Sequence, residues 1–180
     1  MTRTQSRQIL FIFGILSAIL FPRQATGEKP KQPIVFTIQP GFLHADHLRD
    51  IQDGWHPLLK TELHAIRRTW LGYILTFGIS PTDYVRGRRK TTRYLTTGLS
   101  FFRQFEKTRI EYRLQYGSLF TITRASTIFM HSLNSIIKVK PPWQFQVGIE
   151  HIVPNDWLFG TDLKEQYGSF IFSIGGGVAF

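Results

Sequence analysis

The chain has 180 residues, no cysteine and a formal charge of +10 at pH 7. This length suits a single domain, and the lack of cysteine excludes disulfides and thiolate metal sites. The mean hydropathy of −0.10 excludes a bundle of membrane-spanning helices. The positive charge would favour a nucleic-acid partner only if the protein stayed inside the cell.

Residues 1–27 are typical of a secretory signal peptide. Arg3 and Arg7 give a positive n-region, and the apolar run 9–21 is too short to span a bilayer as a helix. Small residues at 25–27 predict cleavage after residue 27, with a short anchor that stays attached as the alternative. Cleavage would remove three arginines and no acid, and would lower the charge from +10 to +7.

After a polar, Pro-rich leader at 28–33, apolar and polar residues alternate with a period of two, which is the signal of β-strands. Each predicted strand has about the 9–11 residues that a tilted strand needs to cross a bilayer. The eight predicted strands are 34–43, 57–66, 70–79, 94–105, 108–117, 127–138, 143–152 and 167–180. The connections between them alternate long and short along the chain, and short periplasmic turns with longer external loops are typical of outer-membrane barrels.

These patterns predict an all-β protein, with residues 34–180 forming an eight-stranded antiparallel up-and-down β-barrel that spans a membrane. Both ends of the mature chain are then expected on the periplasmic side. A soluble lipocalin-like barrel with the same period is the alternative. Small residues on one face of the last strand favour the membrane barrel, because eight strands enclose a narrow lumen.

The last strand ends on alternating apolar residues that include Val178 and finish at Phe180. This ending resembles the assembly signal of bacterial outer-membrane barrels. The whole pattern is similar to the small eight-stranded class that includes outer-membrane protein X, the barrel of outer-membrane protein A and the lipid A deacylases. The resemblance implies a Gram-negative outer membrane, the barrel assembly machinery as a partner, and contact with outer-membrane lipids and lipopolysaccharide. It does not indicate an activity.

Charged residues fall on the predicted inner face of the strands, where they must be paired or solvated. Eight strands leave no open pore, so a salt-bridged plug is favoured over a gated path or narrow channel. These interior residues are Lys60, Glu62, His64, Arg109, Glu111, Arg113, Lys138 and Glu150.

The resemblance to lipid A deacylases supplies an enzymatic alternative. That family has a His-x-Ser pair at the external end of the seventh strand and a Glu before the eighth, where this chain has His151 and Glu165. Val153 stands where the serine would be, and it has no hydroxyl to activate. No metal-ligand spacing, phosphate loop or nucleophile elbow occurs elsewhere, so no metal or cofactor is expected.

The connection at 80–93 contains a run of cations with only Asp83 opposing them. The basic residues are Arg86, Arg88, Arg89, Lys90 and Arg93. They predict an external loop that binds phosphates of lipopolysaccharide or acidic host glycans, with a solvated loop that has no partner as the alternative. The sequence therefore favours a non-enzymatic barrel with an envelope-structural or surface-binding role, ahead of a deacylase-like hydrolase.

Overall fold

A computed structural model describes residues 34–45, 51–83, 89–121, 125–154 and 169–179. The predicted signal peptide at 1–27, the leader at 28–33 and Phe180 lie outside the described residues. No helix of the length and hydropathy needed to cross a membrane occurs in these ranges.

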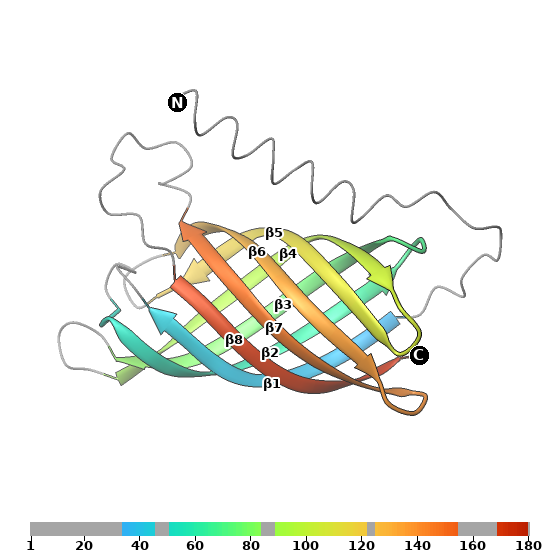
Figure 1. The fold of residues 1–180 in the computed structure, drawn as a ribbon. Helices are drawn as coiled ribbons and strands as arrows, with labels where there is room; N and C mark the ends of the chain where they lie inside the picture. Colours follow the sequence, from blue (N-terminus) through green and yellow to red (C-terminus); the bar gives the residue numbers. More distant parts are fainter. Residues whose placement is uncertain (1–33, 46–50, 84–88, 122–124, 155–168, 180) are drawn as a thin grey trace, which may run out of the picture.

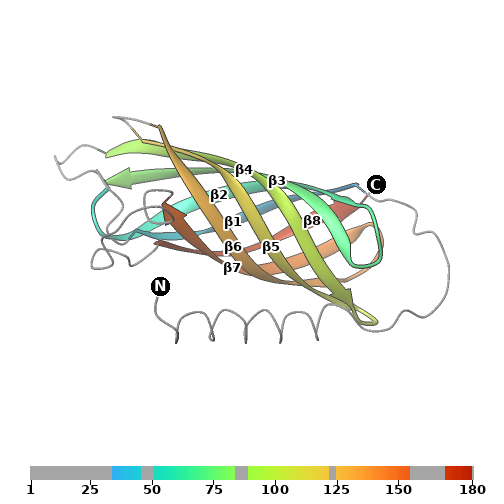
Figure 2. The ribbon, with the colours of Figure 1, turned by 90° about the horizontal axis from the view of Figure 1, so that it is seen from above.

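The described residues form eight strands that wrap around a single lumen (Figures 1 and 2). They are β1 (Ile34–Ala45), β2 (Gly54–Ile66), β3 (Leu71–Asp83), β4 (Arg89–Gln104), β5 (Thr108–Phe120), β6 (Ala125–Lys138), β7 (Trp143–Pro154) and β8 (Ser169–Ala179). Each strand pairs antiparallel with the next, and β8 pairs with β1 to close the barrel. The predicted fold class is thereby confirmed.

The two ends of the barrel differ in their connections. At one end, here called the turn end, β1 begins, β8 finishes and the connections are 67–70, 105–107 and 139–142. At the other, here called the loop end, they are 46–53, 84–88, 121–124 and 155–168. The strand boundaries predicted at the turn end agree with the structure to within about two residues, as expected for boundaries set by short turns.

Several strands continue farther toward the loop end than predicted. The predicted connection 80–93 is a paired hairpin for most of its length, with β3 reaching Asp83 and β4 starting at Arg89. Polar side chains take over the inner face here, and the Oγ1 atoms of Thr82 and Thr92 lie 2.7 Å apart. The backbone pairing of β3 and β4 continues beyond the residues in which apolar and polar side chains alternate. The loop-end connections are therefore mostly shorter than predicted, and differ less in length from the turn-end connections.

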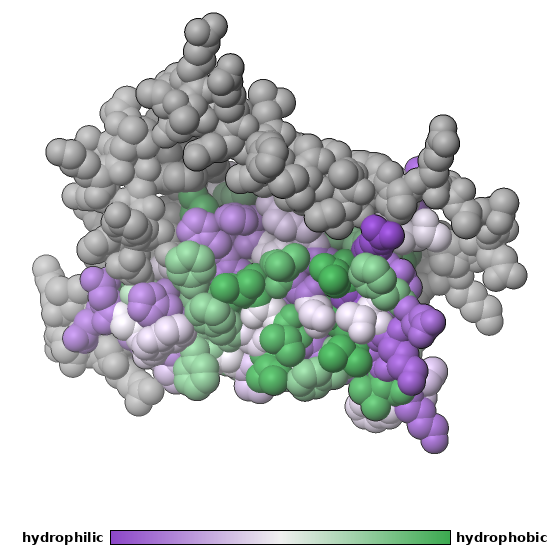
Figure 3. Space-filling view, in the orientation of Figure 1, coloured by the Kyte–Doolittle hydropathy of each residue, from purple (hydrophilic) through white to green (hydrophobic). Residues whose placement is uncertain are grey.

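The outer surface of the barrel is apolar. Large side chains such as Phe42, Leu75 and Ile174 point outward and are roughly half exposed. On the face seen in Figure 3, hydrophobic residues gather across the middle of the barrel, with hydrophilic residues toward the two ends. Backbone groups in a closed barrel are all paired, so such a surface can face lipid. The lipocalin-like alternative, which would bury its apolar face in the lumen, does not fit this surface.

The lumen is filled in layers. At the loop end an apolar cluster that includes Leu43, Tyr94 and Met130 is almost wholly buried. The middle is polar and charged, and a smaller apolar group of Val35, Ile66 and Phe102 lies at the turn end. An eight-stranded barrel has room for little more than its own side chains, and this one follows that rule.

Candidate functional site

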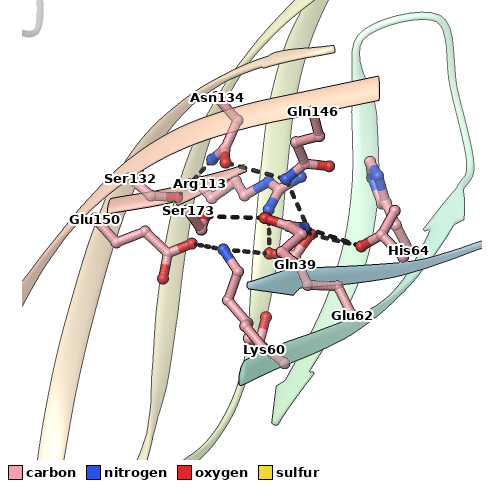
Figure 4. Close-up of polar contacts among 12 residues, drawn as sticks. Gln39, Lys60, Glu62, His64, Arg113, Ser132, Asn134, Gln146, Glu150 and Ser173 are labelled. Carbon is pink, nitrogen blue, oxygen red and sulfur yellow. Dashed lines mark hydrogen bonds and ion pairs between the residues drawn. The ribbon is translucent and has the colours of Figure 1, made fainter. Parts of the chain in front are cut away.

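Three basic and three acidic side chains meet in the polar middle of the lumen, and Figure 4 labels four of them, Lys60, Glu62, Arg113 and Glu150. All six have relative exposures of 3% or less, and they come from β2, β5 and β7. They are Lys60, Arg109, Arg113, Glu62, Glu111 and Glu150. Their charges balance, as buried charges require.

Glu62 lies at the centre of this network. Its Oε1 atom is 2.7 Å from Arg113 Nη1 and 3.0 Å from Lys60 Nζ. Its Oε2 atom accepts hydrogen bonds from Thr37 Oγ1 at 3.2 Å, Gln39 Nε2 at 2.7 Å and Gln146 Nε2 at 3.0 Å. Both carboxylate oxygens are therefore saturated, which fixes Glu62 in its ionised form as an acceptor.

Glu111 contacts the basic side chains on the turn-end side of the network. Its Oε2 atom accepts from Arg113 Nε at 2.9 Å, and Arg113 Nη2 is 2.8 Å from the same oxygen. Arg109 Nε and His64 Nδ1 approach Oε1 at 2.6 and 3.4 Å. The other ring nitrogen of His64 lies 2.6 Å from the Ser100 hydroxyl. Lys60 links this assembly to Glu150 on β7.

The interior network predicted from the sequence contained the charged residues and His64 but not the neutral amides beside them. Gln39, Gln146 and Asn134 are buried and complete the hydrogen bonds of the network. All three occupy inward positions in the same period-2 pattern. Strand parity identifies them as inward polar residues, and a buried carboxylate such as Glu62 needs such neutral donors as well as cations.

Lys138 departs from its predicted interior place. It shares the parity of buried Ile136, yet it is exposed at the last position of β6. Beyond that position the barrel wall ends, so a long side chain reaches water at the turn end.

The predicted basic loop is partly strand. Arg89, Lys90 and Arg93 belong to β4, while Arg86 and Arg88 lie outside the described residues. Lys90 is opposite Thr82 and Arg93 is opposite Ile79, and both basic residues are exposed. Side chains alternate along a strand, so Lys90 projects over the rim of the barrel and Arg93 onto its outer face.

His151 lies on the outer face of β7, directly opposite His131 on β6. His131 Nε2 and His151 Nδ1 are 2.8 Å apart, and the His151 ring stacks on Phe170 at 4.7 Å. Val153 follows on the same strand, and Glu165 lies outside the described residues. In the described part of the chain, no group of three or more His, Cys, Asp or Glu residues is arranged to hold a metal ion.

No family model and no curated protein matches this sequence. Solved structures match in fold. The outer membrane protein Ail of Yersinia pestis in a phospholipid bilayer nanodisc gives a TM-score of 0.51 at 11% identity, over 83% of this chain and all of Ail. Neisserial surface protein A gives 0.51 at 12% identity, over 82% of this chain and 97% of that protein.

A third match is the crystal structure of Ail with the heparin analogue sucrose octasulfate, with a TM-score of 0.50 at 14% identity, over 83% of this chain and 97% of Ail. The chain thus has the fold of the small eight-stranded outer-membrane barrels, as the sequence pattern predicted. Identities this low carry the fold alone and not the activity.

Proposed function

We propose that this protein is a non-enzymatic barrel of the bacterial outer membrane that binds anionic lipopolysaccharide or acidic glycan at its loop end. The binding surface is the cationic rim, defined as Arg86, Arg88, Arg89, Lys90 and Arg93. The observation that carries this proposal is the exposure of Lys90 and Arg93, which have no ion-pair partner among the described residues. Exposed clustered cations attract polyanions.

The charge distribution supports this role. The six buried charges of the lumen cancel one another, so they contribute nothing to the net charge of +7 that the chain would keep after removal of residues 1–27. The excess must then lie at the ends and in the connections. The apolar cluster across the loop end of the lumen also favours binding at the surface over passage through the barrel.

The orientation follows the usual arrangement of such barrels, with the turn end in the periplasm and the loop end facing the medium. Residues 1–27 would direct export and be removed, and the strand end with Val178 and Phe180 would be read by the barrel assembly machinery. The cationic rim would then lie beside the anionic head groups of the outer leaflet. Ail, a barrel of the same fold, has been crystallised with a sulfated heparin analogue, which supports a polyanion as the ligand.

The test compares two variants that each lose four positive charges. One carries Ser at Arg86, Arg88, Arg89 and Lys90, and the control carries Ser at the turn-end residues Arg67, Arg103, Lys107 and Lys140, which are exposed. Binding to lipopolysaccharide vesicles and to heparin is measured at low and high salt, and heat-modifiable gel migration reports folding. Screening beyond about 8 Å at physiological ionic strength makes rim binding salt-sensitive.

We expect the rim variant to lose most of the salt-sensitive binding while the control keeps it. Equal binding by the two variants at every salt concentration would contradict the proposal, because net charge rather than the rim would then set the affinity.

A further inference from the structure

The turn end of the lumen opens into a cavity of about 450 Å³, a size typical of small-molecule sites. Apolar side chains make most of its wall, among them Val35, Ile66, Phe102 and Trp143. The cavity lies at the opposite end of the barrel from the cationic rim. What it binds is therefore independent of the proposed surface function.

Arg109 is the buried cation of this cavity. Only 3% of Arg109 is exposed, and its guanidinium carbon lies 5.2 Å from the centroid of the Phe102 ring. The Nε atom faces Glu111, but the buried Nη2 atom has no hydrogen-bond partner in the part of the chain that the structure describes. A buried N–H without an acceptor is costly. This atom has almost no accessible surface, so an acceptor in the cavity would meet it only after the guanidinium turns toward the opening.

Glu111 is the acid that faces Arg109, and it is not reserved for Arg109. The same carboxylate also pairs with Arg113, and its Oε1 atom lies 3.4 Å from His64 Nδ1, so its single charge is shared. Two more cations, Arg68 and Lys138, line the cavity, and no Asp or Glu does among the described residues. The mouth of the barrel therefore carries a net positive charge from Arg68 and Lys138, above the buried guanidinium of Arg109 and between apolar walls.

We infer that this cavity binds an amphiphilic carboxylate, with its head group on Arg109 and Lys138 and its hydrocarbon body against Phe102 and Trp143. A planar guanidinium matches a carboxylate through parallel N–H···O bonds. Burial of the hydrocarbon body against the apolar walls would stabilise the bound ligand. A small hydrated anion has no hydrocarbon body and would not gain this stabilisation.

The experiment uses the full-length mature protein in lipid nanodiscs, titrated with octanoate and followed by NMR at the backbone amides of Phe102 and Lys138. Acetate supplies the carboxylate without the chain, octanol supplies the chain without the charge, and inorganic phosphate supplies a free anion. Nanodiscs without protein correct for partition of octanoate into the lipid. We expect saturable shifts with octanoate, and binding at least about tenfold weaker for each of the other three probes.

Matched variants assign the head-group contacts. Lys138→Gln changes an exposed residue that lines the cavity, whereas Lys140→Gln changes an exposed cation nearby that does not line it. We expect octanoate binding to weaken about threefold or more in Lys138→Gln, about tenfold in Arg109→Gln, and less than about twofold in Lys140→Gln. Heat-modifiable migration verifies that Arg109→Gln is folded, and Lys138→Gln decides the matter if it is not.

Three results would overturn the inference. Octanol shifting the same amides at the same concentrations would mean simple partition into an apolar mouth. Phosphate binding as tightly as octanoate would mean a site for small anions. Equal octanoate binding by Lys138→Gln and Lys140→Gln would mean that the carboxylate of the ligand does not contact Lys138, and so does not bind in this cavity as inferred.

Discussion

Arg113 and Glu62 form an ion pair across the lumen, with 2.7 Å between Arg113 Nη1 and Glu62 Oε1, which joins β5 to β2. The same guanidinium also holds Glu111 on its own strand through Nε and Nη2. Arg113 is thus the one described cation with contacts to both of these carboxylates, and the two halves of the network meet on it.

We predict that Arg113→Leu destabilises the barrel by about 3–5 kcal/mol, because it leaves two carboxylates in the lumen without their main partner. The measurement is a urea titration in a fixed lipid, with heat-modifiable migration as the readout of folding. Lys140→Leu, which removes an exposed cation at the turn end, serves as the control and should leave the midpoint almost unchanged. Equal midpoints for the two variants would mean that water fills this part of the lumen.

We predict that substitutions at Lys60 and Glu150 are strongly non-additive. Lys60→Met leaves three acids against two bases in the lumen, Glu150→Gln leaves the reverse, and the double variant restores a two-to-two balance. Each single change should cost about 3–5 kcal/mol, and the double change clearly less than their sum. The cycle is measured by urea unfolding. Additivity within about 0.5 kcal/mol would show that the pair is not coupled.

The face of each side chain could be predicted from the sequence, but its partner could not. Strand parity alone puts Glu62 and Arg113 on an inner face, because side chains alternate strictly along a strand. Their contact joins positions 51 residues apart on strands that are not neighbours. It depends on the stagger and tilt of the closed barrel, which no local pattern contains.

The loop-end boundaries and the histidine pair were missed for related reasons. Thr82 and Thr92 continue the hydrogen-bonded ladder with polar inner residues, where an apolar pattern gives no signal. His131 lies on a different strand from its partner His151, 20 residues along the chain, so no local pattern joins the two rings. The cross-strand register that brings the two rings together is set by the turn between β6 and β7.

We predict that Gly78→Ala destabilises the barrel while Gly176→Ala does not. A Cβ atom on Gly78 would lie 2.0 Å from Cε1 of Tyr94, whose ring is buried at 2% exposure and closes the loop end of the lumen. Such overpacking costs about 1–3 kcal/mol. A Cβ on outward-facing Gly176 would meet its nearest atom at 3.7 Å. Urea midpoints decide between them, and an unchanged midpoint for Gly78→Ala would mean that the Tyr94 ring moves freely.

The last prediction concerns catalysis: expression of this protein leaves the acylation of lipid A unchanged. A histidine base needs a nucleophile within hydrogen-bond reach, and His151 Nδ1 instead faces His131 Nε2 at 2.8 Å. Val153 offers no hydroxyl at the position where the deacylases have serine. The measurement is the mass of lipid A from cells with and without the protein. Loss of an acyl chain that disappears in His151→Ala, but persists in a His44→Ala control at the loop end of β1, would replace the binding proposal with a hydrolase.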